Sequence, residues 1–319
     1  MLELYFFSLY QFCLLQNLIT GSATPLMHKV MTDASKRLPA PVPELGFSTL
    51  HEHWSKRARY TGDRLISYDM GDTSDHVVFY QRLGIPCAYF LWMPNPGTWH
   101  DALYPIYHSA YENFDLMANI LDPGFVYHKS VAEFWGSIAL GVASPKFLSE
   151  AMDVEEVGVS LNEGHDILRA KYGHILDREN ITTKYMQGFI NKYVANAKKF
   201  NKMIKSLKEQ NIPLDPLSTR IINDQIILIE KAFIDFAGIP RRPWQKNVVF
   251  GTNIESAYSG WIYPGVHEAL FDFEESDDKE KRLDEIKQQL SVISHVINSA
   301  ASVLEDIRFP GLQTTSNKR

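Results

Sequence analysis

The chain has 319 residues, of which 45% are hydrophobic and 22% charged, and its net charge is −6. This composition excludes a disordered, collagen-like or disulfide-framework protein, and the acidic balance gives no reason to expect nucleic acid as a partner. With only Cys13 and Cys87 present, a cysteine-based zinc cluster is also excluded. The length suits two domains of about 150 residues each.

Residues 1–23 form an apolar N-terminal segment with three possible roles. The run 4–19 contains polar residues and is too short for a membrane span, which needs about 20 mostly apolar residues. Residues 21–23 are small enough for a signal-peptide cleavage site, although no Lys or Arg precedes the apolar run. The alternatives are an ordinary buried segment or a start outside the fold. The sequon at Asn180 would permit glycosylation in a secreted chain.

Residues 24–150 are interpreted as an α/β domain. Polarity alternates over 75–82, and the run 87–92 is typical of a buried strand. A short helix is expected over 112–121 and a buried helix over 125–140. The order of strand, loop and helix favours an α/β architecture.

Residues 151–319 are interpreted as a helical domain, so the predicted fold class is α/β plus α. Helices are expected over 185–210 and over 219–237, the second with Ser218 as its N-cap. A longer helix is predicted by apolar residues that alternate in spacing between three and four: Leu283, Ile286, Leu290, Ile293, Ile297, Ala300, Leu304 and Ile307. This seam serves either the core of the chain's own bundle or, in part, a dimer interface. The irregular stretch 239–275 has the composition of a functional loop.

Few motifs in the sequence indicate chemistry. It contains no glycine-rich phosphate loop, no G-x-S-x-G and no H-E-x-x-H. His108 follows a proline-containing loop and precedes a predicted helix, a position where α/β enzymes often hold ligands. Spacing alone favours an ordinary hydrogen-bonded histidine at this position.

Several strings share a pattern with one known family. They are GDTSDHVVFYQRLGI (71–85), YPIYHSAYE (104–112), NDQ (223–225), EKAFID (230–235) and PGVHEALFD (264–272). Together they resemble the C-terminal half of the glutamate carboxypeptidase II family. That family includes the N-acetylated-alpha-linked acidic dipeptidases and, as a non-enzymatic relative, the transferrin receptor. The resemblance covers roughly residues 24–307.

The resemblance implies a fold and a chemistry. Residues 24–150 would be the last part of a zinc-peptidase α/β domain, and 151–319 a transferrin-receptor-like dimerisation domain that forms a homodimer. The family hydrolyses peptides with two zinc ions, which activate a water and stabilise the oxyanion. By position, His108 matches a zinc ligand and Tyr107 matches a tyrosine that stabilises the tetrahedral intermediate.

The chain also departs from the family pattern. The other four zinc ligands and the catalytic Glu would lie upstream of the resemblance, and one imidazole does not hold a catalytic zinc. Two positions match substrate-binding residues: Ser74 stands in place of an asparagine, and Tyr258 is retained. Tyr89, Leu91 and Ala257 replace basic residues that pair with an acidic substrate side chain, which favours a more apolar substrate.

Two functions therefore compete. The chain is either the C-terminal portion of a zinc metallocarboxypeptidase-like protein, inactive by itself and without stoichiometric zinc, or a non-catalytic dimerisation protein of the transferrin-receptor branch. The resemblance implies a peptide substrate for the full-length enzyme. Family members are mostly membrane-anchored with extracellular catalytic domains, so the localisation of this chain stays open.

Overall fold

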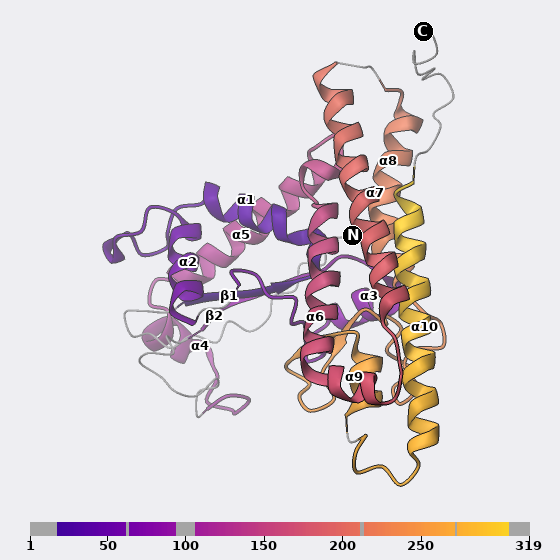
Figure 1. The fold of residues 1–319 in the computed structure, drawn as a ribbon. Helices are drawn as coiled ribbons and strands as arrows, with labels where there is room; N and C mark the ends of the chain where they lie inside the picture. Colours follow the sequence, from indigo (N-terminus) through magenta and orange to yellow (C-terminus); the bar gives the residue numbers. More distant parts are fainter. Residues whose placement is uncertain (1–17, 62–63, 94–105, 211–213, 272, 306–319) are drawn as a thin grey trace.

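The computed structural model describes residues 18–61, 64–93, 106–210, 214–271 and 273–305, and Figure 1 shows their arrangement. A smaller part, built from the first half of the chain, lies beside a tall layer of helices from the second half. The helix α6 stands at the boundary between them.

The first part combines one pair of strands with helices. Its elements are β1 (Leu18–Ala23), α1 (His28–Arg37), α2 (Leu50–Thr61), α3 (His76–Leu83), β2 (Ala88–Met93), α4 (Phe114–Leu116) and α5 (Val126–Ala143), with short helical turns at Pro25–Met27, Pro43–Leu45, Met117–Leu121 and Leu148–Glu150. β1 and β2 are antiparallel, with Gly21 opposite Phe90. A Cβ atom at Gly21 would lie 2.7 Å from the Trp54 ring, so this glycine lets α2 pack directly on the strand.

Most elements expected in the first part are found. The expected strand at 87–92 is β2, and the expected helix at 125–140 is α5. The segment 75–82, in which polarity alternates, is mainly helix α3, which ends at Gly84 with a positive φ of 59°. Among the described residues of the first part, β2 pairs with β1 in a two-stranded sheet, so the peptidase α/β architecture expected for 24–150 stays a prediction.

The apolar N-terminal segment is described only from residue 18 onward. Residues 18–23 form β1, where Ile19 and Ala23 are fully buried. The candidate cleavage residues 21–23 therefore pair with β2 inside the fold. The rest of the run 4–19 lies outside the described residues. None of the helices in the described ranges is long and apolar enough to span a bilayer.

The second part is a helical layer with a small hairpin. Its elements are α6 (Val154–Arg178), α7 (Lys184–Glu209), α8 (Pro216–Ala232), β3 (Phe250–Thr252), β4 (Gly260–Ile262), α9 (Pro264–Leu270) and α10 (Lys279–Val303). α10 packs on α7, α8 and α9. Its seam residues from Ile286 to Leu304 are buried, so the seam forms the core of the chain's own bundle.

Helix α8 begins and ends earlier than the sequence suggested. Asp215, rather than Ser218, is the N-cap, because its carboxylate accepts the N–H groups of Leu217 and Ser218 at 2.9 and 3.0 Å. Pro216 follows at the first helical position, where its missing N–H costs no hydrogen bond. The helix ends at Ala232, and Gly238, with a φ of 71°, lies in the turn beyond it.

Candidate functional site

A cleft of about 500 Å³ lies where the two parts meet. β1, the loop after α2, α6 and the β4–α9 segment all contribute to its walls. We call it the β1–α6 cleft, and its lining consists of Thr20, Gly21, Ser22, Trp54, Arg64, Leu65, Ser67, Tyr68, Asp69, Glu163, Gly164, Ile167, Tyr258, Gly260, Trp261, Ile262 and His267. One wall is charged and the other is mainly aromatic and aliphatic.

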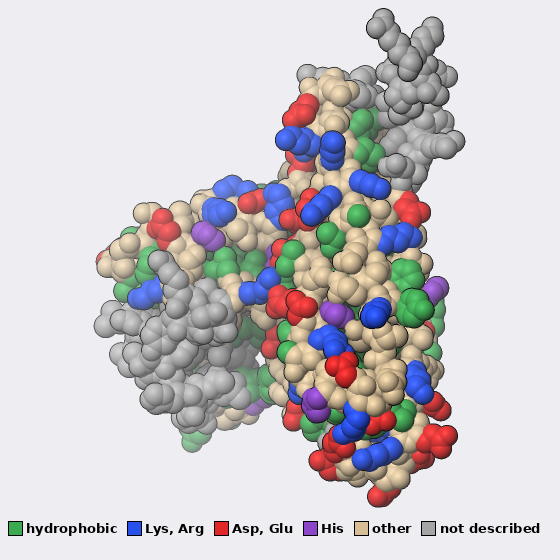
Figure 2. All heavy atoms as spheres, in the orientation of Figure 1, with side chains coloured by type: hydrophobic (Ala, Val, Ile, Leu, Met, Phe, Trp, Pro, Cys, Tyr) green, Lys and Arg blue, Asp and Glu red, His purple; other side chains and the backbone are tan. Residues whose placement is uncertain are grey.

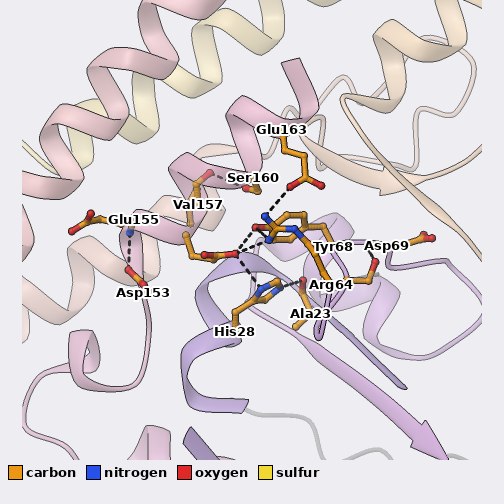
Figure 3. A network of polar contacts seen from close by, with 12 residues as sticks. Ala23, His28, Arg64, Tyr68, Asp69, Asp153, Glu155, Val157, Ser160 and Glu163 are labelled. Atoms are coloured by element: carbon orange, nitrogen blue, oxygen red, sulfur yellow. Dashed lines mark hydrogen bonds and ion pairs between the residues drawn. The ribbon is translucent and has the colours of Figure 1, made fainter. Parts of the chain in front are cut away.

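Arg64 joins the loop after α2 to helix α6. Its guanidinium lies 3.1 Å from the Glu156 carboxylate and 2.9 Å from that of Glu163. It also donates a hydrogen bond of 2.6 Å to the Tyr68 hydroxyl, which in turn donates to Glu156. Figure 3 shows these side chains converging, with His28 approaching from the start of α1. The charged wall is therefore held by contacts among three separate segments.

These contacts shift the protonation equilibria of the network. The His28 imidazole, 3.4 Å from Glu156, acts with Tyr68 and Arg64 to lower the pKa of Glu156 to about 2, although burial opposes the shift. Burial and the hydrogen bond to Glu156 raise the pKa of the Tyr68 phenol. At neutral pH, Glu156 is therefore ionised and Tyr68 is a neutral donor.

The Asp69–Asp72 loop lies directly against the 257–260 loop. The Asp72 N–H donates a 2.8 Å hydrogen bond to the Ala257 carbonyl, and the Asp69 carboxylate accepts the Gly260 N–H. A Cβ atom on Gly71 would lie 2.3 Å from the Ala257 oxygen, so only glycine permits this approach. Burial raises the pKa of Asp69, while the Gly260 N–H lowers it.

This approach brings together the segments that carry the two predicted substrate-binding residues. Tyr258 lies in the cleft lining, with 59% of its surface exposed. Ser74 is half-buried just beyond the Asp69–Asp72 loop, where its carbonyl accepts the Val77 N–H, and it is not among the lining residues. The structure thus places Tyr258, but not Ser74, in the wall of the cleft.

Tyr107 and His108 lie in the turn 106–112 and do not line the cleft. Their rings stack with centroids 3.9 Å apart, and His108 is exposed with a positive φ of 59°. The His108 N–H donates a 2.8 Å hydrogen bond to Glu112. Residues 94–105, just before this turn, lie outside the described residues.

The residues around His108 do not fit a zinc centre by themselves. Within the described ranges, no three His, Cys, Asp or Glu side chains are grouped closely enough to hold a metal ion. A catalytic zinc normally takes three protein ligands. We therefore derive no chemical step through zinc from these residues.

Sequence analysis identified Tyr258 but none of the charged residues that shape the cleft. Glu156 and Glu163 lie seven residues apart, a spacing that puts both on one face of a helix. That spacing alone does not predict a polar network, because the partners of these carboxylates, Arg64 and His28, come from distant segments of the chain. His267, in the opposite wall, is 2% exposed, and burial together with Lys171 lowers its pKa to about 4.

Comparison with known proteins supports the predicted resemblance. Residues 181–305 match the transferrin receptor-like dimerisation domain family. The chain is 27% identical over 296 residues to rat aminopeptidase NAALADL1. The aligned region covers 91% of the chain and 38% of that relative. It is 25% identical over 290 residues to the probable glutamate carboxypeptidase LAMP1 of Arabidopsis thaliana, covering 89% of the chain and 38% of the relative. A Caenorhabditis briggsae glutamate carboxypeptidase 2 homolog is 25% identical over 300 residues, with the same two coverages of 89% and 38%. The chain thus spans well under half the length of these relatives.

Proposed function

We propose that this chain supplies the dimerisation helices and one wall of the peptide-binding cleft of a glutamate carboxypeptidase-like protein. The premise is that the chain corresponds to a C-terminal portion of those proteins. The match of residues 181–305 to the dimerisation domain family carries this proposal. The β1–α6 cleft, which holds the retained Tyr258, supports the second half of it.

The outer face of α10 supports dimerisation. Two shallow grooves flank it, one lined by residues of α7 and α10 and the other by the end of α8 with α10, and Ser291 and His295 line both. Tyr185 lies in the first groove and is 75% exposed, while Phe236 lies in the second and is 87% exposed. Figure 2 shows hydrophobic side chains along this edge of the molecule. Aromatic side chains that flank grooves are typical of protein interfaces.

We assign the remaining site residues by resemblance. In the full-length protein His108 would be a zinc ligand and Tyr107 would stabilise the oxyanion, while Ser74 and Tyr258 would contact substrate. Since one imidazole is too few for a catalytic zinc, this chain alone is not expected to hydrolyse peptides. Stoichiometric zinc together with dipeptide hydrolysis by the purified 319-residue chain would contradict this expectation.

The competing proposal is a dimerisation protein without catalysis. The replacement of basic residues by Tyr89, Leu91 and Ala257 does not decide between the two proposals, because it favours a more apolar substrate rather than the loss of catalysis. The two proposals share the dimer and differ in peptide binding, so a titration of the chain with peptides separates them.

Sedimentation equilibrium tests the dimer. The wild-type chain is expected to be dimeric at micromolar concentration, and the double variant Tyr185→Ser, Phe236→Ser to dissociate at least tenfold more readily, because both changes remove exposed aromatic surface beside α10. The matched control is Tyr111→Ser, which removes a tyrosine that is 73% exposed in the other part of the molecule. A monomeric wild-type chain, or equal dissociation of variant and control, would overturn the proposal.

A further inference from the structure

We propose that the β1–α6 cleft binds the ammonium group of a peptide, with an adjoining apolar side chain of that peptide against its aromatic wall. This inference deepens the proposed peptide-binding role and rests on it. It names the charge and the kind of side chain that the cleft accepts.

The charges of the lining favour a cation. Asp69 and Glu163 contribute two carboxylates, whereas Arg64 is the one Lys or Arg among the described residues of the lining. The Arg64 guanidinium is already engaged by Glu163 and by Glu156 beneath the cleft. The Asp69 carboxylate accepts a hydrogen bond from the Gly260 N–H, which leaves acceptor capacity on its oxygens. An ammonium group would therefore meet more negative than positive charge.

The opposite wall suits the apolar part of such a ligand. Tyr258 and Ile167 are 59% and 47% exposed there, beside the half-buried Trp261. The Lys171 ammonium already lies 5.3 Å from the centroid of the Trp261 ring. Because this lysine already occupies the Trp261 ring, the ammonium group of the ligand would lie at the carboxylates of the opposite wall and its apolar side chain against Tyr258 and Ile167.

His267 gives a second, independent indication of a ligand. Its side chain lines the cleft while only 2% of the residue is exposed, and its Nδ1 has no hydrogen-bond partner among the described residues. Buried polar atoms normally have a partner, so this ring nitrogen calls for one that the described residues do not supply, either a ligand or a water. A neutral imidazole also adds no charge that would repel an ammonium group.

Calorimetric titration of the full 319-residue chain tests the inference with three probes. Alanyl-phenylalanine amide carries an N-terminal ammonium, its Nα-acetyl form carries none, and Nα-acetyl-lysine methylamide carries a side-chain ammonium. We expect the first probe to bind at least tenfold more tightly than its acetylated form. The lysine probe decides the source of the ammonium: tighter binding of that probe than of the dipeptide assigns a basic side chain, and the reverse assigns the N-terminus.

Two variants locate the binding. Asp69→Asn and Glu163→Gln each keep an acceptor oxygen and remove a charge, and each is expected to weaken binding of the dipeptide amide about tenfold. Asp284→Asn, a change of an exposed acid on α10, is the matched control and should leave binding unchanged. Equal binding of acetylated and free dipeptide, or equal affinity of all three variants, would overturn the inference. Sedimentation of the same samples reports separately on the dimer, so failure of the cleft is distinguishable from failure of the proposed function.

Discussion

A half-buried and a fully buried carboxylate show how residue environment sets protonation in opposite directions. Glu156 lies among hydrogen-bond donors, which stabilise its charged form and lower its pKa to about 2. Glu230, near the C-terminal end of α8, is fully buried, and desolvation raises its pKa to about 8 despite the Thr24 hydroxyl. One carboxylate therefore strengthens the fold when ionised, and the other weakens it.

Glu156→Gln should lower the free energy of unfolding at pH 7 by about 1–2 kcal/mol, a figure reduced for the partial exposure of the group. Because the folded pKa lies below the unfolded value of 4.5, the contribution of Glu156 is present above pH 4.5 and disappears as the pH falls towards 2. Urea unfolding across this range should show wild type and variant converging. Glu133→Gln, in an exposed pair with Lys129, is the control and should track the wild type throughout.

Glu230→Gln should have the opposite effect. The folded pKa lies above the unfolded value of 4.5, so the wild-type protein loses stability as the pH rises from 4.5 to about 8. The variant should be more stable than wild type by about 1–3 kcal/mol at pH 8 and no more stable at pH 4. Thermal unfolding at the two pH values measures this, with the exposed Glu209→Gln as the reference. A loss of stability at pH 8 would show that the charged form has a partner.

Helix α6 approaches β4 closely because Gly164 has no side chain. A Cβ atom there would lie 2.4 Å from Cγ2 of Ile262 and 2.8 Å from the Tyr263 ring. Gly188 on α7 offers a contrast, since its Cβ position has no atom within 4 Å. The same residue type thus serves packing in one helix and lies on open surface in the other.

Gly164→Ala is expected to destabilise the protein by about 1–3 kcal/mol, because the branched Ile262 side chain must move. Gly188→Ala is expected to stabilise it by about 0.5–1 kcal/mol, because alanine loses less backbone entropy on folding. Urea unfolding of the two variants measures both changes. Stabilisation by both changes would mean that α6 and β4 adjust freely to the added methyl group.

The sequence predicted the long helices better than the cleft. The regular spacing of apolar residues in 283–304 indicated α10, since that pattern is local. The residues of α3 were harder to assign because β-branched and aromatic side chains dominate a helix of only eight residues. The Arg64 network was out of reach, because it joins three segments whose proximity depends on the folded chain. Tyr258 was identified through resemblance and lies in the cleft, but its role, like those of His108, Tyr107 and Ser74, stays a prediction.

At the scale of the whole molecule, one hydrophobic core runs through both parts. Trp54 and Phe134 of the first part belong to the same buried cluster as Val157 of α6 and Ile293 of α10. Arg64 adds polar contacts across the boundary. The two domains expected on either side of residue 150 therefore share one core, and the division between them stays a prediction.

Unfolding in urea is accordingly expected to be a single transition. Tryptophan fluorescence reports mainly on the first part, since Trp54, Trp92, Trp99 and Trp135 are four of the six tryptophans, whereas far-UV circular dichroism reports mainly on the long helices. The two signals should have the same midpoint, because a shared core couples the parts. Midpoints that differ by more than the error of the fit would indicate two independently stable units.

The position of α10 along the chain has a consequence for synthesis. Helices α7, α8 and α9 leave the ribosome before the helix on which all three pack. Their apolar faces therefore stay exposed to water until the 25-residue α10 has been translated, and nascent chains are vulnerable to aggregation during this period. A nonsense mutation before codon 279 would leave these faces permanently uncovered, and its product should be a substrate for chaperones and proteases in the cell.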